Sequence, residues 1–69
     1  MITITVNGDD KTFENEITVI ELLKACEVSS PEMVSVELND DMLSRDQFES
    51  TTIADGDEFE FLFFMGGGQ

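Results

Sequence analysis

Apolar and polar residues alternate along three segments of the chain, and this period of two predicts strands with one buried face. The segments are residues 2–6, 34–38 and 58–64. The faces predicted to lie in the core consist of Ile2, Ile4, Val6, Val34, Val36, Leu38, Phe59, Phe61 and Phe63. In the last segment Leu62 and Phe64 share the opposite face with two glutamates, so we expect both to lie on the outside of the sheet.

Asparagine, glycine and aspartate interrupt these segments and indicate where the chain reverses, because they tolerate turn conformations. Such turns are predicted at residues 7–10, 39–41 and 54–57. The first leads into a second short strand around Thr12, Phe13 and Ile17, which completes a hairpin. After the second turn, Met42 and Leu43 are expected to form a very short strand.

The segment after the hairpin has the pattern of a short helix. Thr18 and Glu21 have the spacing of a capping box. Apolar residues then recur at helical spacing at Val19, Leu22, Leu23 and Cys26. We expect a helix of about two to three turns that ends before Pro31. A weaker capping box at residues 44–47 predicts one helical turn that ends near Phe48.

Composition narrows the class of protein. A chain of 69 residues that is 41% hydrophobic, with six phenylalanines, predicts one small folded domain rather than a disordered acidic tail. The net charge of −13 argues against nucleic acid and anionic membranes as partners. One cysteine and no histidine exclude a disulfide framework and a zinc or iron–sulfur site that needs several cysteines. With no signal-peptide pattern and no long apolar run, we expect a cytoplasmic protein.

The most unusual feature is the final segment, Met65-Gly66-Gly67-Gly68-Gln69. We therefore divide the chain into a domain at residues 1–64 and a flexible tail at residues 65–69. An arm of glycines can thread a narrow channel in another protein and present its terminal carboxyl group for chemistry. A frayed terminus is the alternative from composition alone. A phosphate-binding glycine loop is disfavoured, because neither a helix nor a lysine follows.

Other candidate chemistry is weak, and we expect no catalytic residue, metal site or bound cofactor in this chain. Cys26 lies on the apolar stripe of the predicted helix, so we expect it to pack against the core. The paired aspartates lie in turns without the spacing of a calcium loop. Leu62, Phe64 and Met65, with acidic residues around them, predict a patch that docks a partner protein, with partial burial under a loop as the alternative.

The order strand, strand, helix, strand, short helix, strand, glycines is that of a β-grasp, ubiquitin-like domain. The sequence resembles the ThiS family of sulfur carrier proteins over essentially its whole length. The resemblance is carried by residues 18–23, 36–39, 44–48 and 55–57, together with the terminal glycines. It implies an α+β fold, in which a mixed sheet of four to five strands packs on one main helix and a short helical turn is added.

The resemblance also implies a reaction at Gly68. A ThiF-like adenylyltransferase, related to ubiquitin-activating enzymes, uses ATP to adenylate the carboxylate of Gly68, with Gly66 and Gly67 threading its channel. Sulfur from a cysteine desulfurase relay then displaces AMP and leaves a thiocarboxylate. A synthase such as thiazole synthase accepts this sulfur. The chain is thus expected to be a carrier and not an enzyme, and its acidic surface to steer it toward a basic groove.

Gln69 lies one residue beyond the terminal diglycine. Related carriers are trimmed by a zinc-dependent JAMM-type peptidase, so the resemblance implies removal of Gln69 to free Gly68. The extra residue weakens the assignment to thiamin thiazole synthesis, because by the resemblance such processing is more typical of carriers that serve methionine, cysteine and other sulfur pathways. Two alternative functions also stand: a ubiquitin-like modifier joined to lysines through Gly68, and a non-reactive binding module that uses an acidic sheet face.

Overall fold

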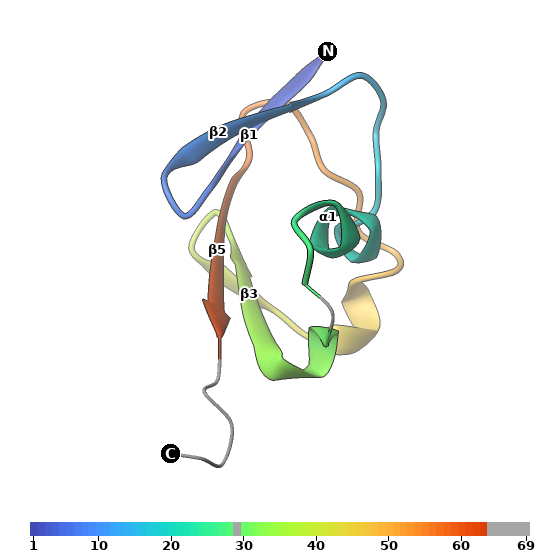
Figure 1. Ribbon diagram of the computed structural model, residues 1–69, viewed down its shortest axis with the longest axis vertical. Coiled ribbons are helices and arrows are strands. Elements are labelled where there is room, and N and C mark those ends of the chain that lie inside the picture. The colour runs from blue at the N-terminus through green and yellow to red at the C-terminus, as the bar shows by residue number, and fades with distance from the viewer. Residues whose placement is uncertain (29, 64–69) are drawn as a thin grey trace.

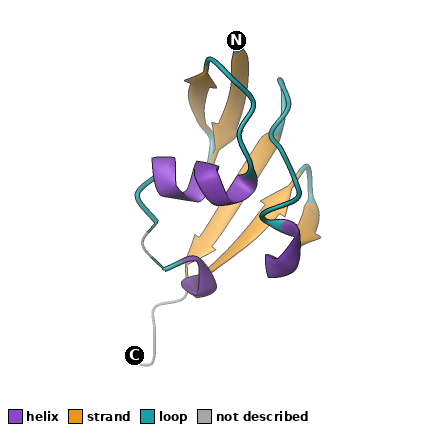
Figure 2. Ribbon diagram, turned by 90° about the vertical axis from the view of Figure 1, so that its right-hand side faces the viewer, coloured by secondary structure: helices purple, strands orange, loops and turns teal. Residues whose placement is uncertain are grey.

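The computed structural model describes residues 1–28 and 30–63, which form a five-stranded sheet with one helix across one face (Figures 1 and 2). The strands are β1 (Ile2–Val6), β2 (Asp9–Phe13), β3 (Val34–Leu38), β4 (Asp41–Leu43) and β5 (Glu58–Phe63). The helix is α1 (Val19–Ala25), and two 3-10 helices are η1 (Pro31–Met33) and η2 (Arg45–Gln47). The expected α+β fold is confirmed.

The last strand of the chain lies in the middle of the sheet, whose order is β2-β1-β5-β3-β4. β5 runs parallel to β1 and pairs with it at only two positions, Thr5 with Glu58 and Val6 with Phe59. Against β3 it is antiparallel and pairs over five positions, the last being Val34 with Phe63. The sheet is therefore mixed, and β5 continues past the point where β1 ends.

The core lies between α1 and the sheet and consists of apolar side chains. Its buried members are Ile4, Val6, Val19, Leu22, Leu23, Val34, Val36, Phe48, Ile53, Phe59 and Phe61. Among the described residues no polar or charged side chain is buried. Hydrophobic burial, rather than a polar network, therefore holds this small domain together. No described helix has the length and apolar character that crossing a bilayer requires.

The predicted capping boxes position both helical segments. The Thr18 hydroxyl accepts the Glu21 backbone N–H at 3.2 Å, and the Glu21 carboxylate accepts the Thr18 N–H at 2.8 Å. In the second box the Gln47 side-chain oxygen accepts the Ser44 N–H at 2.9 Å. These bonds satisfy backbone donors that a helix start leaves free. The predicted helix and the turn that ends near Phe48 are thus confirmed, as is the short strand at Met42 and Leu43.

The second strand is shorter than predicted. β2 ends at Phe13, and Ile17 lies outside any strand. The carbonyl of Ile17 instead accepts the N–H of Ile53 at 2.9 Å, and Thr18 forms an isolated bridge with Thr52. This pairing ties the segment before α1 to the loop before β5, which explains why the apolar Ile17 is half-buried without belonging to the hairpin.

The core face predicted for β5 was wrong at its last position. Phe59 and Phe61 are buried, whereas Phe63 is 53% exposed. The Phe63 ring lies edge-on to Phe61, with 6.5 Å between ring centroids, so it follows the predicted face. It pairs with Val34, the first residue of β3, beyond the end of β1. Alternation therefore predicted the face of Phe63 correctly but not how far the core extends along it.

Candidate functional site

The predicted site lies where β5 leads into the C-terminal segment, and only its first part is described. Leu62 is within the described residues. Phe64, Met65, Gly66, Gly67, Gly68 and Gln69 lie outside them. The part of the site that can be described is therefore β5, which precedes the C-terminal segment, and the strands on either side of it.

Leu62 and Phe63 expose apolar side chains on opposite faces of β5. Leu62 is 49% exposed and pairs with Ser35 of β3, on the same face as the two glutamates of β5, as predicted. Phe63, on the other face, is exposed because the core ends at Phe61. The exposure of Phe63 was not predicted from the sequence, which placed this residue in the core. Its position at the very end of an apolar alternation was the available signal.

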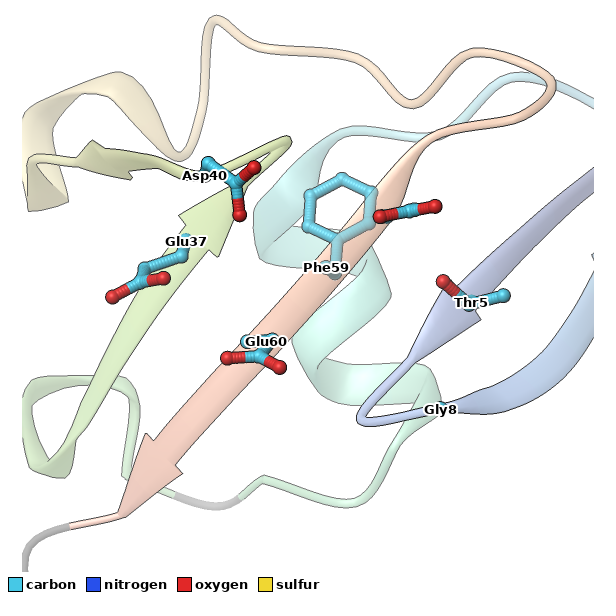
Figure 3. A pocket seen from close by; sticks show the side chains of 7 residues that line it. Thr5, Gly8, Glu37, Asp40, Phe59 and Glu60 are labelled. Atoms are coloured by element: carbon cyan, nitrogen blue, oxygen red, sulfur yellow. The ribbon is translucent and has the colours of Figure 1, made fainter.

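The face of the sheet opposite α1 carries an acidic hollow, which Figure 3 shows from close by. Its volume is ≈ 300 Å³, and it spans β1, β5 and β3. The residues that line it are Thr5, Gly8, Glu37, Asp40, Glu58, Phe59 and Glu60. Four of these seven residues carry carboxylates and none carries a positive charge, so the hollow attracts cationic groups.

Two carboxylates of this hollow face each other directly across neighbouring strands. Glu37 of β3 is paired with Glu60 of β5 in the antiparallel register. Like charges at such positions destabilise a sheet. The chain's only basic residues lie elsewhere, in β2, α1 and η2: Lys11, Lys24 and Arg45. Because nothing within the hollow neutralises the pair, a positively charged partner surface would relieve the repulsion.

Metal binding is not favoured by this arrangement. Within residues 1–28 and 30–63 no three or more His, Cys, Asp or Glu residues are grouped so that they could hold a metal ion. The carboxylates of the acidic hollow are spread over β3, β5 and the turn between β3 and β4, an arrangement that suits the separated ammonium or guanidinium groups of a protein surface.

The Asp-Gly-Asp turn before β5 serves the backbone, as expected. Asp55 accepts the Thr3 N–H at 2.7 Å, and Asp57 accepts the Ala54 N–H at 2.8 Å. Gly56 has φ of 89°, a left-handed conformation that favours glycine, and its N–H donates to the Thr3 carbonyl at 2.8 Å. The two bonds to Thr3 join the turn before β5 to β1, and the bond to Ala54 closes the turn itself.

Cys26 packs against the core, as its place on the apolar stripe predicts. It is half-buried at the end of α1, where its N–H donates to the Leu22 carbonyl at 3.0 Å. Burial raises the pKa of the Cys26 thiol, and the positive charge of Lys11 only partly opposes this. A thiol with a raised pKa holds less of the reactive thiolate, which agrees with a packing role for Cys26.

Comparison with known proteins shows which protein family this chain resembles. A family model described as the ThiS family matches residues 4–68. The crystal structure of a thiamine biosynthesis protein (ThiS) from Geobacter metallireducens superposes with a TM-score of 0.82 and 48% identity, covering 97% of this chain and 100% of that one. A solution structure of a thiamine biosynthesis protein from the same organism gives a TM-score of 0.80 and 47% identity, covering 99% and 90%.

Two curated relatives differ in how much of their own length is matched. A thiazole synthase of Paramagnetospirillum magneticum is 32% identical over 65 residues, which are 94% of this chain but 20% of that protein. An uncharacterized protein, ycf40, of Pyropia yezoensis is 37% identical over 67 residues, 97% of this chain and 93% of that protein. The chain thus spans about a fifth of the thiazole synthase and nearly all of the second relative.

Proposed function

This chain belongs to the ThiS family, and from that premise we propose that it is a sulfur carrier protein of thiamine biosynthesis, with Gly68 as its reactive end. The observation that carries the proposal is the extent of the family match, which runs through Gly68 and leaves out Gln69. The two solved structures from Geobacter metallireducens support the pathway, because both are named as thiamine biosynthesis proteins.

The proposed chemistry takes place on the terminal carboxylate, which is a poor electrophile until one oxygen becomes part of a leaving group. A ThiF-like adenylyltransferase joins that oxygen to the α-phosphorus of ATP and releases pyrophosphate. A persulfide from a cysteine desulfurase relay then attacks the carbonyl carbon and AMP leaves. A thiol cleaves the S–S bond of the resulting acyl disulfide and is itself oxidised to a disulfide with the relay cysteine. The thiocarboxylate that results carries sulfur without free sulfide. The chain supplies the handle for this reaction and its partners supply the catalytic groups, in the reducing cytoplasm.

A thiazole synthase is the proposed sulfur acceptor. Support comes from the relative of that name, in which the segment that is 32% identical to this chain forms 20% of a longer protein. A carrier domain joined to the enzyme that consumes its sulfur is presented at high effective concentration. We propose that this chain reaches an equivalent enzyme by docking, after a JAMM-type peptidase has removed Gln69.

Docking is proposed at the end of β5, through Leu62 and the neighbouring Phe64 and Met65. The exposure of Leu62 and Phe63 supports an apolar contact at this position, and the acidic hollow lies beside it on the same sheet. Exposed apolar groups bordered by charge are typical of protein–protein contacts. The carboxylates would steer the chain toward a basic groove, and the apolar end would be buried on docking.

Replacement of Leu62 by aspartate tests this docking surface. Leu62→Asp is expected to raise the KM of the carrier for its adenylyltransferase about tenfold, because an apolar anchor at the centre of a contact typically contributes that much. Met42→Asp is the matched control, since Met42 is 61% exposed on the edge strand β4. Steady-state pyrophosphate exchange measures both. Equal effects of the two variants would contradict docking at the end of β5.

The experiment that tests the function is the intact mass of the untagged protein from its own host, recovered under conditions that preserve thioacids. Loss of Gln69 together with the exchange of one oxygen for sulfur supports both the processing step and the carrier role. An unmodified chain that still ends in Gln69 under sulfur-demanding growth counts against both. Higher-mass isopeptide conjugates in the same lysate would instead indicate a protein modifier.

A further inference from the structure

Two asparagines lie on opposite edges of β5, and each bonds to that strand with its side chain. Asn7 and Asn39 occupy the two-residue turns of the β1–β2 and β3–β4 hairpins, and both have φ of 52°. Figure 3 shows these turns, marked by Gly8 and Asp40, on either side of β5. Turn chemistry explains why asparagine is tolerated at this position, but it leaves the role of the side chain open.

Asn7 bonds to Phe61 through both polar atoms of its side chain. Its Nδ2 donates to the Phe61 carbonyl at 3.3 Å, and its Oδ1 accepts the Phe61 N–H at 2.8 Å. The Asn7 backbone N–H also donates to the Phe59 carbonyl at 3.0 Å. Because β1 pairs with β5 only as far as Phe59, the Asn7 side chain acts as one more strand residue and extends this edge to Phe61.

Asn39 makes comparable bonds at the other end of β5. Its backbone N–H donates to the Glu58 carbonyl at 2.8 Å, and its Oδ1 accepts the Glu58 N–H at 2.9 Å. Its Nδ2 donates to Asp57 at 3.2 Å. Asn39 thus fixes the start of β5, whereas Asn7 fixes the part that adjoins Leu62 and Phe63. The two residues match in type and turn position and differ in which end of β5 they hold.

The backbone carbonyls of β5 point alternately toward β1 and toward β3, and this alternation shows which hydrogen bonds depend on Asn7. The carbonyls of Asp57, Phe59 and Phe61 accept hydrogen bonds on the β1 side, the last from Asn7 alone, whereas Glu58 bonds toward β3. Phe63 comes next on the β1 side, beyond the end of β1. If Asn7 lost its side chain, Phe61 would lose both of its backbone hydrogen bonds to Asn7, and the end of β5 would be held only through the pairing of its other residues with β3.

We propose that Asn7 is a positioning residue for the reaction at Gly68, because it fixes the end of β5 from which the C-terminal segment leads to the partner's active site. This inference rests on the proposed function. A strand end that is already ordered loses less conformational entropy when the carrier docks. Asn7 therefore acts through Phe61 and the docking surface, without contact to the reacting atoms.

The matched variants Asn7→Gly and Asn39→Gly test this role. Both keep a residue that adopts the left-handed turn without strain, and both remove side-chain bonds to β5. In pyrophosphate exchange with the chain ending at Gly68, Asn7→Gly is expected to raise KM about tenfold with kcat nearly unchanged. Asn39→Gly should leave KM unchanged, even where urea unfolding shows a similar loss of stability. Asn7→Asp, which keeps the acceptor for the Phe61 N–H, should recover part of the loss.

Amide hydrogen exchange gives a second readout that needs no partner enzyme. The Phe61 amide should exchange faster in Asn7→Gly and keep its protection in Asn39→Gly. Equal KM values for the two glycine variants, with a wild-type chain that is adenylated, would overturn the positioning role and leave the proposed function intact. A wild-type chain that is not adenylated at all would overturn the proposed function, and the positioning role with it.

Discussion

Removal of Gln69 is expected to raise the rate of adenylation by about 100-fold in the absence of any peptidase, because we propose that the carboxylate of Gly68, and not that of Gln69, is adenylated. One extended residue displaces the carboxylate by about 3.5 Å, and a misplacement of about 1 Å can already cost two orders of magnitude in rate. The choice of Gly68 as the reactive residue is supported by the family match, which ends at this position. The measurement is pyrophosphate exchange with a purified adenylyltransferase, in which kcat/KM is compared between the two chains.

A third chain distinguishes the effect of the position of the terminal carboxylate from the effect of the glutamine side chain. Gln69→Gly keeps the full length of 69 residues and removes the side chain of the last residue. If register decides the rate, this variant stays slow. If only the glutamine side chain obstructs the channel, it recovers the rate of the chain that ends at Gly68. Equal rates for the unaltered chain and the shortened one would contradict the need for processing.

Local sequence signals predicted most elements of the fold, because each has a cause within a few residues. Thr18 with Glu21 and Ser44 with Gln47 bond within their own turns, and the structure contains both pairs of contacts. The alternation of Phe59 and Phe61 with glutamates likewise predicted which side of β5 is buried. Such features depend on backbone geometry and burial alone, so they can be inferred from one sequence.

Features that depend on distant residues were not predicted from the residues themselves. The exposure of Phe63 follows from where β1 ends, and β1 lies more than 50 positions away in the chain. Asn7 was assigned correctly to a turn, but its bonds to Phe61 join residues 54 positions apart. The central place of β5 in the sheet was not predicted, since no local pattern states which strand neighbours which.

The candidate site also contains features that the local sequence predicts and one feature that depends on the pairing of distant strands. A run of glycines is unusual in any structural context, so Gly66, Gly67 and Gly68 could be singled out from the sequence alone. Leu62 could be placed on the outer face by alternation, and the structure confirms it. The acidic hollow could not be foreseen as a hollow, because Glu37 and Glu60 meet only through the pairing of β3 with β5.

Phe48→Ala is expected to lower the free energy of unfolding by about 3 to 5 kcal/mol, the range for removal of a buried phenylalanine. Phe48 is 2% exposed, and its carbonyl accepts the Ile20 N–H at 3.1 Å, so its ring and backbone join η2 to α1. A domain of this size has about 3 to 10 kcal/mol in total, so much of the variant should be unfolded at room temperature.

Phe63→Ala is the matched control for this loss, and urea unfolding measures both variants. The same atoms are removed, but Phe63 is 53% exposed, so the cost should be well under half of that at Phe48. The comparison also distinguishes a contribution to folding stability from a contribution to docking. Phe48 lies in the core, whereas Phe63 lies beside the proposed docking surface. Equal losses at the two positions would mean that Phe63 is part of the core, and the end of β5 could then not offer an exposed apolar contact to a partner.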